Sequence, residues 1–188
     1  MLLNDLALIE EGVNGLIEPF NKNNVGPASV DLTLGSEFLF LPPETGKNLT
    51  NLKQKDDIKK YIYNDKINGE VIIGPGEFIL GTTEEKVNIP AGLAAFIQGR
   101  SSIGRLGIFI ENAGFIDPGF SGQITLELFN ASPKKYKLET GIKICQLIVH
   151  CLKNPAHNPY NGKYQNQKGT TGSRIYKDYQ RKQKKTGL

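Results

Sequence analysis

The densest group of polar residues lies between Gln98 and Gly107, where two arginines, two serines and three glycines occur within ten residues. Guanidinium groups match the geometry of phosphate oxygens, and the start of a helical turn presents free backbone N–H groups to an anion. The segment Arg100–Arg105 is therefore a candidate polyphosphate-binding loop. The same pattern also fits an ordinary capped turn with surface arginines, and spacing alone leaves both interpretations open.

Two carboxylates further along the chain are candidates for sugar binding or acid–base chemistry. Asp117 precedes a Pro-Gly pair, a common turn signature, but at the end of a strand it could also bind a sugar hydroxyl or a metal-bound water. Glu127 lies in the alternating segment 123–130, on the face opposite Ile124, Leu126 and Leu128, which must be core. Glu127 is then either a solvated glutamate or, beside Phe129 on a half-buried face, a general base.

Histidines and cysteines are too few, or too badly spaced, for several kinds of site. The two histidines are His150 and His157, so Ser-His-Asp and Cys-His catalysis are not expected. Cys145 and Cys151 share one strand-like segment and would lie about 20 Å apart, too far for a disulfide. The zinc-deaminase signature, His-x-Glu with Pro-Cys-x-x-Cys, is absent. The chemistry must come from carboxylates, hydroxyls, Arg, Lys and Tyr.

These candidates are embedded in a pattern of short strands. Apolar residues at helical spacing predict a helix within residues 1–11 that stops at Gly12. Period-2 alternation between Gly/Pro turns then predicts one all-β domain with a barrel or jelly-roll-like fold. Strands are expected at 29–34, with 37–41 as its hairpin partner, and at 70–73, 78–82, 85–89, 94–98, 107–111, 123–130, 136–139 and 143–151. Residues 44–70 are expected to form a long loop, and those after Pro155 a mobile tail.

Composition and charge limit the class of protein. The chain has 188 residues, 38% of them hydrophobic, with 21 glycines and 10 prolines, which indicates one turn-rich globular domain. No apolar run reaches the roughly 18 residues of a membrane span, and the N-terminus lacks a basic signal-peptide region, so a cytoplasmic protein is expected. The net charge of +4 resides in segment 174–188, which carries +5. That segment is expected to be a solvated tail, and nucleic-acid binding is not expected.

Several motifs, in order, resemble the dCTP deaminase family of the dUTPase superfamily. They are Pro27-Ala28-Ser29-Val30-Asp31-Leu32-Thr33-Leu34, the segment Arg100–Arg105, and Ala113-Gly114-Phe115-Ile116-Asp117-Pro118-Gly119-Phe120-Ser121-Gly122 continuing to Glu127. The resemblance extends from the N-terminal helix to about Arg174. It implies a distorted β-barrel (a dUTPase-like β-clip) in residues 1–155, with a C-terminal lid and basic tail in residues 156–188. It also implies a homotrimer with nucleotide sites between subunits.

The resemblance further implies zinc-free deamination of dCTP. Glu127 would be the general base and acid that activates water at C4 of cytosine, with Ser101 and Arg105 near the base and the water. Asp117 would meet the 3′-hydroxyl of deoxyribose, Gln146 would lie near the phosphates, and Mg²⁺ would be bound through the triphosphate. The implied substrate contacts are Arg100, Ser101, Ser102, Ile103, Gly104, Arg105, Ala113, Gly114, Asp117, Thr125, Leu126, Glu127, Gln146, Tyr160, Lys163 and Gln167.

The last part of the resemblance concerns the lid and the choice of reaction. Tyr160, Lys163 and Gln167 match positions where the C-terminus of the family closes over the triphosphate, so residues 169–173 are expected to form a lid that excludes water. The run 113–117 resembles the bifunctional members, which convert dCTP to dUMP, ammonia and pyrophosphate. Alternatives are a dUTP diphosphatase without deaminase activity and a non-catalytic nucleotide-binding regulator. Inhibition by dTTP is a family trait.

Overall fold

A computed structural model describes residues 1–41, 51–55, 63–66, 69–110 and 114–185. Strands predominate, as the sequence predicts. The helical elements are α1 (Asp5–Glu11), η1 (Gly12–Leu16), η2 (Lys22–Asn24), α3 (Ser101–Gly104) and α4 (Tyr176–Lys185). The strands are β1 (Ile17–Glu18), β2 (Val30–Thr33), β3 (Glu37–Phe40), β4 (Tyr63–Lys66), β5 (Glu70–Ile73), β6 (Phe78–Asn88), β7 (Leu93–Gly99), β8 (Ile108–Ile110), β9 (Phe115–Ile116), β10 (Ser121–Asn130), β11 (Tyr136–Glu139) and β12 (Lys143–Cys151).

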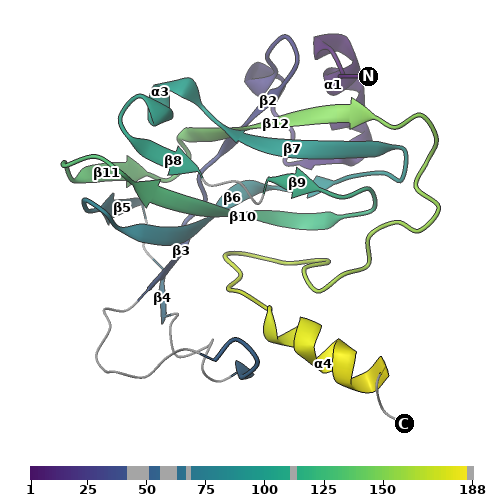
Figure 1. The fold of residues 1–188 in the computed structure, drawn as a ribbon. Coiled ribbons are helices and arrows are strands. Elements are labelled where there is room, and N and C mark those ends of the chain that lie inside the picture. Colours follow the sequence, from purple (N-terminus) through teal and green to yellow (C-terminus); the bar gives the residue numbers. More distant parts are fainter. Residues whose placement is uncertain (42–50, 56–62, 67–68, 111–113, 186–188) are drawn as a thin grey trace.

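The strands form three sheets. A six-stranded sheet has the order β4-β3-β6-β10-β8, with β1 also paired to β6, and a four-stranded sheet has the order β2-β12-β7-β9. Strands β5 and β11 form a two-stranded sheet. In Figure 1 the four-stranded sheet lies above the six-stranded one, and over the described ranges the sheets do not close into one barrel. The expected all-β, jelly-roll-like architecture is confirmed, with open sheets in place of a closed cylinder.

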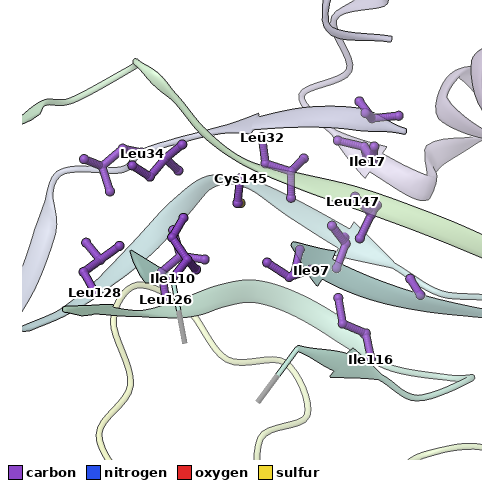
Figure 2. Packing of buried hydrophobic residues seen from close by; sticks show 14 of the residues in the cluster. Ile17, Leu32, Leu34, Ile97, Ile110, Ile116, Leu126, Leu128, Cys145 and Leu147 are labelled. Atoms are coloured by element: carbon purple, nitrogen blue, oxygen red, sulfur yellow. The ribbon is translucent and has the colours of Figure 1, made fainter. Parts of the chain in front are cut away.

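The core lies between the two larger sheets. Figure 2 shows Leu32, Cys145 and Leu147 of the four-stranded sheet facing Leu126 and Leu128 of β10. All five are at most 1% exposed. Burial raises the pKa of the Cys145 thiol, so this cysteine is a neutral core residue, and neither cysteine forms a disulfide, as predicted.

The N-terminal helix forms where the sequence predicts it but does not stop at Gly12. Asn4 caps α1 through its side-chain oxygen, which accepts the N–H of Ala7 at 3.1 Å. Gly12 stays helical and leads into η1, and the helical path ends near Gly15, whose φ is 94°. A Cβ on Gly12 would lie 2.3 Å from the Phe20 ring, so this glycine permits a close approach instead of ending the helix.

The predicted hairpin between 29–34 and 37–41 is wrong, because the two strands belong to different sheets. Strand β2 pairs with β12, whereas β3 pairs with β4 and β6. The chain crosses between the sheets at Gly35, whose N–H donates to the Thr82 carbonyl at 2.8 Å. A Cβ on Gly35 would lie 2.8 Å from Thr82 Cγ2, so the crossing requires a glycine here. In the local sequence pattern the same glycine is typical of a hairpin turn, which explains the wrong prediction.

The segments 78–82 and 85–89, predicted as two strands, form the single strand β6 with an irregularity. From the pair Gln123–Lys86 to the pair Thr125–Thr82, β10 advances two residues while β6 advances four. This bulge turns Glu85 inward, where it is 5% exposed and accepts the N–H and the hydroxyl of Thr33, each at 2.9 Å. Burial raises the pKa of the Glu85 carboxyl, and the Thr33 hydrogen bonds oppose that shift.

The sequence prediction also missed elements with partners far along the chain. Strand β4 lies inside the predicted loop 44–70, of which residues 44–50, 56–62 and 67–68 lie outside the described residues. The two-residue strands β1 and β9 pair with β6 and β7. Helix α4 forms in the segment expected to be a solvated tail. Among the described residues, no helix is long and apolar enough to cross a membrane.

The core geometry predicts which strand substitutions destabilise the fold. Leu128→Ala removes a side chain that is 0% exposed, so it should lower the free energy of unfolding by about 2–5 kcal/mol. Ile72→Ala, at a position 57% exposed, is the control and should change it by less than about 1 kcal/mol. Chemical denaturation of both variants measures the difference, and equal losses would contradict the position of the core.

Candidate nucleotide site

A cavity of about 620 Å³ lies over the face of β10 that points away from the core. Six of the predicted site residues line it: Asp117, Thr125, Glu127, Tyr160, Lys163 and Gln167. A smaller adjoining cavity is lined by Gly114, Thr125, Leu126 and Glu127, among others. The predicted contact Ala113 lies outside the described residues.

Strand alternation places Glu127 and Thr125 on the floor of the larger cavity. Leu126 and Leu128 of the same strand point into the core, so Thr125 and Glu127 point to the opposite face, as the sequence predicts. Ile124, also expected on the core face, is only half-buried and lines the cavity, because the irregularity between Gln123 and Thr125 interrupts the alternation. In the β6–β10 pairing, Glu127 is opposite Leu80 and Thr125 is opposite Thr82. Glu127 is a half-buried carboxylate held on a central strand, which fixes its position more firmly than a loop would.

Asp117 enters the cavity from the turn that precedes β10. The turn is closed by the N–H of Phe120, which donates to the Asp117 carbonyl at 3.1 Å. This leaves the Asp117 side chain exposed at the cavity wall, while Phe120 packs inward. Asp117 therefore makes the turn, as the first interpretation expects, and also presents its carboxylate to the cavity.

The C-terminal segment closes the other side of the cavity and is ordered against the sheet. The N–H of Tyr160 donates to the Pro118 carbonyl at 2.7 Å, and the N–H of Thr171 donates to Thr125 Oγ1 at 3.1 Å. A Cβ on Gly119 would lie 2.6 Å from Pro159 Cβ, so a glycine is needed where the segment crosses the turn. The expectation of a mobile tail is wrong for these residues. Hydrogen bonds to β10 and to the turn before it hold the segment in place, and a pattern of apolar residues does not predict such bonds.

The lid residues expected to meet a triphosphate have protein partners in this structure. Lys163 forms an ion pair with Asp178, and the Gln167 amide donates to the Gln123 carbonyl at 2.7 Å. The Tyr160 hydroxyl accepts the N–H of Tyr164 at 3.1 Å. All three predicted side chains thus reach the cavity wall, and each is held there by a neighbour.

The polyphosphate-binding candidate is a separate surface at the end of β7. Arg100 precedes the short helix α3, whose N-terminal turn is closed by bonds from the N–H groups of Ile103 and Gly104 to the Arg100 carbonyl, at 3.0 and 2.9 Å. The side chains of Ser101, Ser102 and Arg105 are exposed around this turn.

Two residues that the sequence reasoning did not place in the site complete this surface. Asp31 of β2 forms ion pairs with Arg100 Nε at 3.1 Å and with Lys143 Nζ at 3.2 Å. Gln146 lies on the neighbouring strand β12, and its amide donates to the Ser29 hydroxyl at 3.2 Å. One carboxylate between two cations leaves a net positive charge, and the surface formed by Arg100–Arg105, Asp31, Lys143 and Gln146 is called the cationic surface below. The available signal was that Ser29 and Asp31 alternate along the Pro27–Leu34 motif and so share a strand face.

The structure does not bring the two groups of predicted residues together within one chain. No residue of Arg100–Arg105, nor Gln146, lines either cavity that contains Glu127. In Figure 1, α3 lies at the top, beside the ends of β7 and β12, whereas the C-terminal segment runs beneath β10. One chain therefore presents a cationic surface and a carboxylate-bearing pocket on different sides of the core.

Relatives align with nearly the whole length of the chain. The protein called "dCTP deaminase, dUMP-forming" of Persephonella marina is 46% identical over 181 residues, covering 95% of this chain and 99% of the relative. The "dCTP deaminase" of Halorubrum lacusprofundi is 41% identical over 189 residues, covering 95% of this chain and 93% of the relative. These alignments include both groups of candidate residues.

A solved structure and a family model agree with these relatives. The 2′-deoxycytidine 5′-triphosphate deaminase of Agrobacterium tumefaciens superposes with a TM-score of 0.64 at 21% identity, covering 80% of this chain and 47% of that one, which shows the fold. The model of the dCTP deaminase-like family matches residues 5–152, from α1 through β12. On the strength of that match and the near full-length relatives, the chain belongs to the dCTP deaminase-like family.

Proposed function

We propose that the protein converts dCTP to dUMP, releasing ammonia and pyrophosphate. The observation that carries the proposal is Glu127, a carboxylate on a rigid strand at the floor of a cavity of about 620 Å³. A cavity of roughly 300–1,000 Å³ is typical of small-molecule sites. The name "dCTP deaminase, dUMP-forming" of the relatives from Persephonella marina and Aquifex aeolicus supports this choice over deamination alone.

The proposed reaction consumes two water molecules. Glu127 takes a proton from the first water as it attacks C4 of cytosine and delivers a proton to N3. Glu127 then transfers the proton of the new C4 hydroxyl to the amino group, the C4–N bond breaks as the C4 carbonyl forms, and ammonia leaves the uracil base. The second water attacks the α-phosphorus, the bond to the bridging oxygen breaks, and pyrophosphate leaves. Asp117 binds the 3′-hydroxyl of deoxyribose, and Thr125, Leu126 and Gly114 surround the nucleoside.

The phosphates are proposed to bind the cationic surface of a second copy of the chain. Since Arg100–Arg105 and Gln146 lie apart from the Glu127 cavity, a complete site needs two copies. A closed ring, here a homotrimer, supplies every cavity with a neighbouring cationic surface. Ser101 and Arg105 would then reach the base and the water, with Arg100, Ser102 and the Ile103–Gly104 backbone on the phosphates.

Mg²⁺ is proposed to arrive on the triphosphate. This cation keeps several water ligands and commonly binds through substrate phosphates with one or two carboxylates. Asp31, a carboxylate within the cationic surface, is already paired with Arg100 and Lys143, which fits a metal carried by phosphate oxygens. The bound Mg²⁺ would neutralise negative charge on the phosphate oxygens.

Residues 156–188 are proposed to act as lid and tail to a catalytic unit formed by residues 1–155. Tyr160, Lys163 and Gln167 already lie at the cavity wall, so a bound triphosphate would exchange their present partners for phosphate oxygens. Lid closure excludes water and strengthens charge interactions in the site. dUTP, as the deaminated nucleotide, would bind the same pocket as a substrate, and dTTP as an inhibitor.

Product analysis tests the reaction itself. Incubation of the protein with dCTP and Mg²⁺, followed by anion exchange, should yield dUMP, pyrophosphate and ammonia in equal amounts. dUTP as the sole product would reduce the activity to deamination. Untouched dCTP together with hydrolysis of dUTP would replace the proposal with a dUTP diphosphatase.

Removal of the Glu127 carboxylate tests the acid–base role. Glu127→Gln should lower the rate of ammonia release by at least about 100-fold, because the amide cannot accept the proton of the attacking water. Binding of dCTP, followed by calorimetry, should survive. Glu70→Gln, at an exposed residue of β5 paired with Lys137, is the matched control and should keep full activity. Full turnover by the Glu127 variant would refute the role of Glu127 as general base and acid.

Complementation tests whether each site spans two copies. Glu127→Gln and Arg105→Ala chains should each be inactive alone, because each lacks one half of the site. Co-expressed in equal amounts, they should recover roughly one quarter of the wild-type activity, since random assembly pairs the two intact halves with that frequency. Mixed assemblies without activity would place both halves in one chain.

A further inference from the structure

Gln123 connects the sheet to the C-terminal segment through both its side chain and its main chain. It is the last residue of β10 paired before the β6 bulge, opposite Lys86. Two residues later in β10 comes Thr125, on the cavity floor. Bulges commonly occur next to active sites, where they redirect side chains.

On the sheet side, the Gln123 amide group satisfies carbonyls that the bulge leaves without ladder partners. Its Nε2 donates to the Thr83 carbonyl at 2.9 Å and to the Glu84 carbonyl at 3.2 Å. A glutamine amide has two N–H donors, and both are used here. The side chain is thereby held in one orientation, with Oε1 directed away from the bulge.

On the lid side, the remaining hydrogen-bonding groups of Gln123 hold residues 167–169. Oε1 accepts the N–H of Gly169 at 2.7 Å. The main-chain N–H donates to the Gln167 carbonyl at 3.1 Å, and the main-chain carbonyl accepts the Gln167 side-chain amide at 2.7 Å. A single residue therefore provides three of the bonds that fasten this part of the lid to the sheet.

The fastened residues are those that form the cavity wall. Gln167 and Thr171 line the cavity together with Thr125 and Glu127, and the Thr171 N–H donates to Thr125 Oγ1 at 3.1 Å. Gly169 lies between them with φ at 61° and approaches Glu37 so closely that a Cβ would lie 1.9 Å from Glu37 Oε2. The path of the lid from Gln167 to Thr171 thus depends on the anchor at Gln123.

We propose that Gln123 is a positioning residue that couples the β6–β10 bulge to the lid, so that Gln167 and Thr171 face the reacting nucleotide. It acts through the lid and does not touch the reacting atoms. The role of Gln123 in holding the lid follows from its hydrogen bonds to Gln167 and Gly169. Its effect on catalysis rests on the proposed function.

Hydrogen exchange measured by mass spectrometry tests the structural part without any substrate. Gln123→Met keeps the side-chain volume but removes its donors and acceptor, so peptides covering 165–173 should exchange about five- to tenfold faster. Peptides covering 126–130 should be unchanged. Gln180→Ala, which alters an exposed glutamine of α4, is the matched control and should leave both regions unchanged. Unchanged exchange in 165–173, or equal acceleration in 126–130, would overturn the proposal.

A second variant guards against a failure of Gln123→Met to fold. Gln123→Asn keeps the amide but is one methylene shorter, so it cannot reach the bulge carbonyls and the Gly169 N–H at once. It should accelerate exchange in 165–173 by a similar factor. Wild-type exchange in this variant would count against the proposal in the same way.

Kinetics with dCTP test the catalytic part. Gln123→Met should lower kcat/KM by about tenfold. Gly169→Ala, which displaces the lid by the clash with Glu37, should lower it as well. The double variant should match Gly169→Ala alone, because both changes act through the lid. Multiplied losses would show that Gln123 acts elsewhere. A wild-type protein inactive on dCTP would refute the proposed function, and exchange would still decide the role of Gln123.

Discussion

The antiparallel pairing of β6 with β10 is the constraint on which the site depends. One side of this pair carries Ile79, Leu126 and Leu128 into the core, and the other side carries Thr125 and Glu127 to the cavity floor. Because the side-chain period of a strand is two, a slip of one residue would exchange core and site. Burial of the leucines therefore fixes the position of the carboxylate, and the energy that folds the sheet also orients the candidate catalytic group.

The bulge interrupts the regular β6–β10 ladder, and side-chain hydrogen bonds around it stabilise the irregular backbone. The Ile124 N–H donates to Thr83 Oγ1 at 3.0 Å, and the Thr83 hydroxyl donates to the Glu85 carbonyl at 2.7 Å. Glu85 in turn joins β6 to β2 through Thr33. A buried carboxylate with a raised pKa is thus tolerated because two donors from another strand meet it. The irregularity links the two sheets at the point where the lid also fastens.

How far the sequence predicts this molecule depends on the range of the interactions involved. Alternation is local, so β10, β11 and β12 and the outward position of Glu127 are predictable from residues 123–151 alone. The pairing of β3 with β6 and the continuity of β6 depend on residues about 40 or more positions away, so local pattern does not predict them. Asp117 and Glu127 are singled out by their local pattern, whereas Thr125, Tyr160, Lys163 and Gln167 enter the candidate site only through the family resemblance. The sequence does not predict the roles of Asp31, Lys143 and Gln123, because these roles depend on contacts with distant segments.

The separation of the two candidate half-sites also follows from the sandwich. Arg100, Asp31 and Gln146 stand on the outer side of the four-stranded sheet, while Glu127 stands on the outer side of the six-stranded sheet, with one core between them. Neither half can reach the other through close-packed side chains. Under the proposed assembly, each chain gives its cations to one site and its carboxylate to another. The packing of a single core then sets the geometry of two sites at once, so a core substitution far from any nucleotide would disturb both.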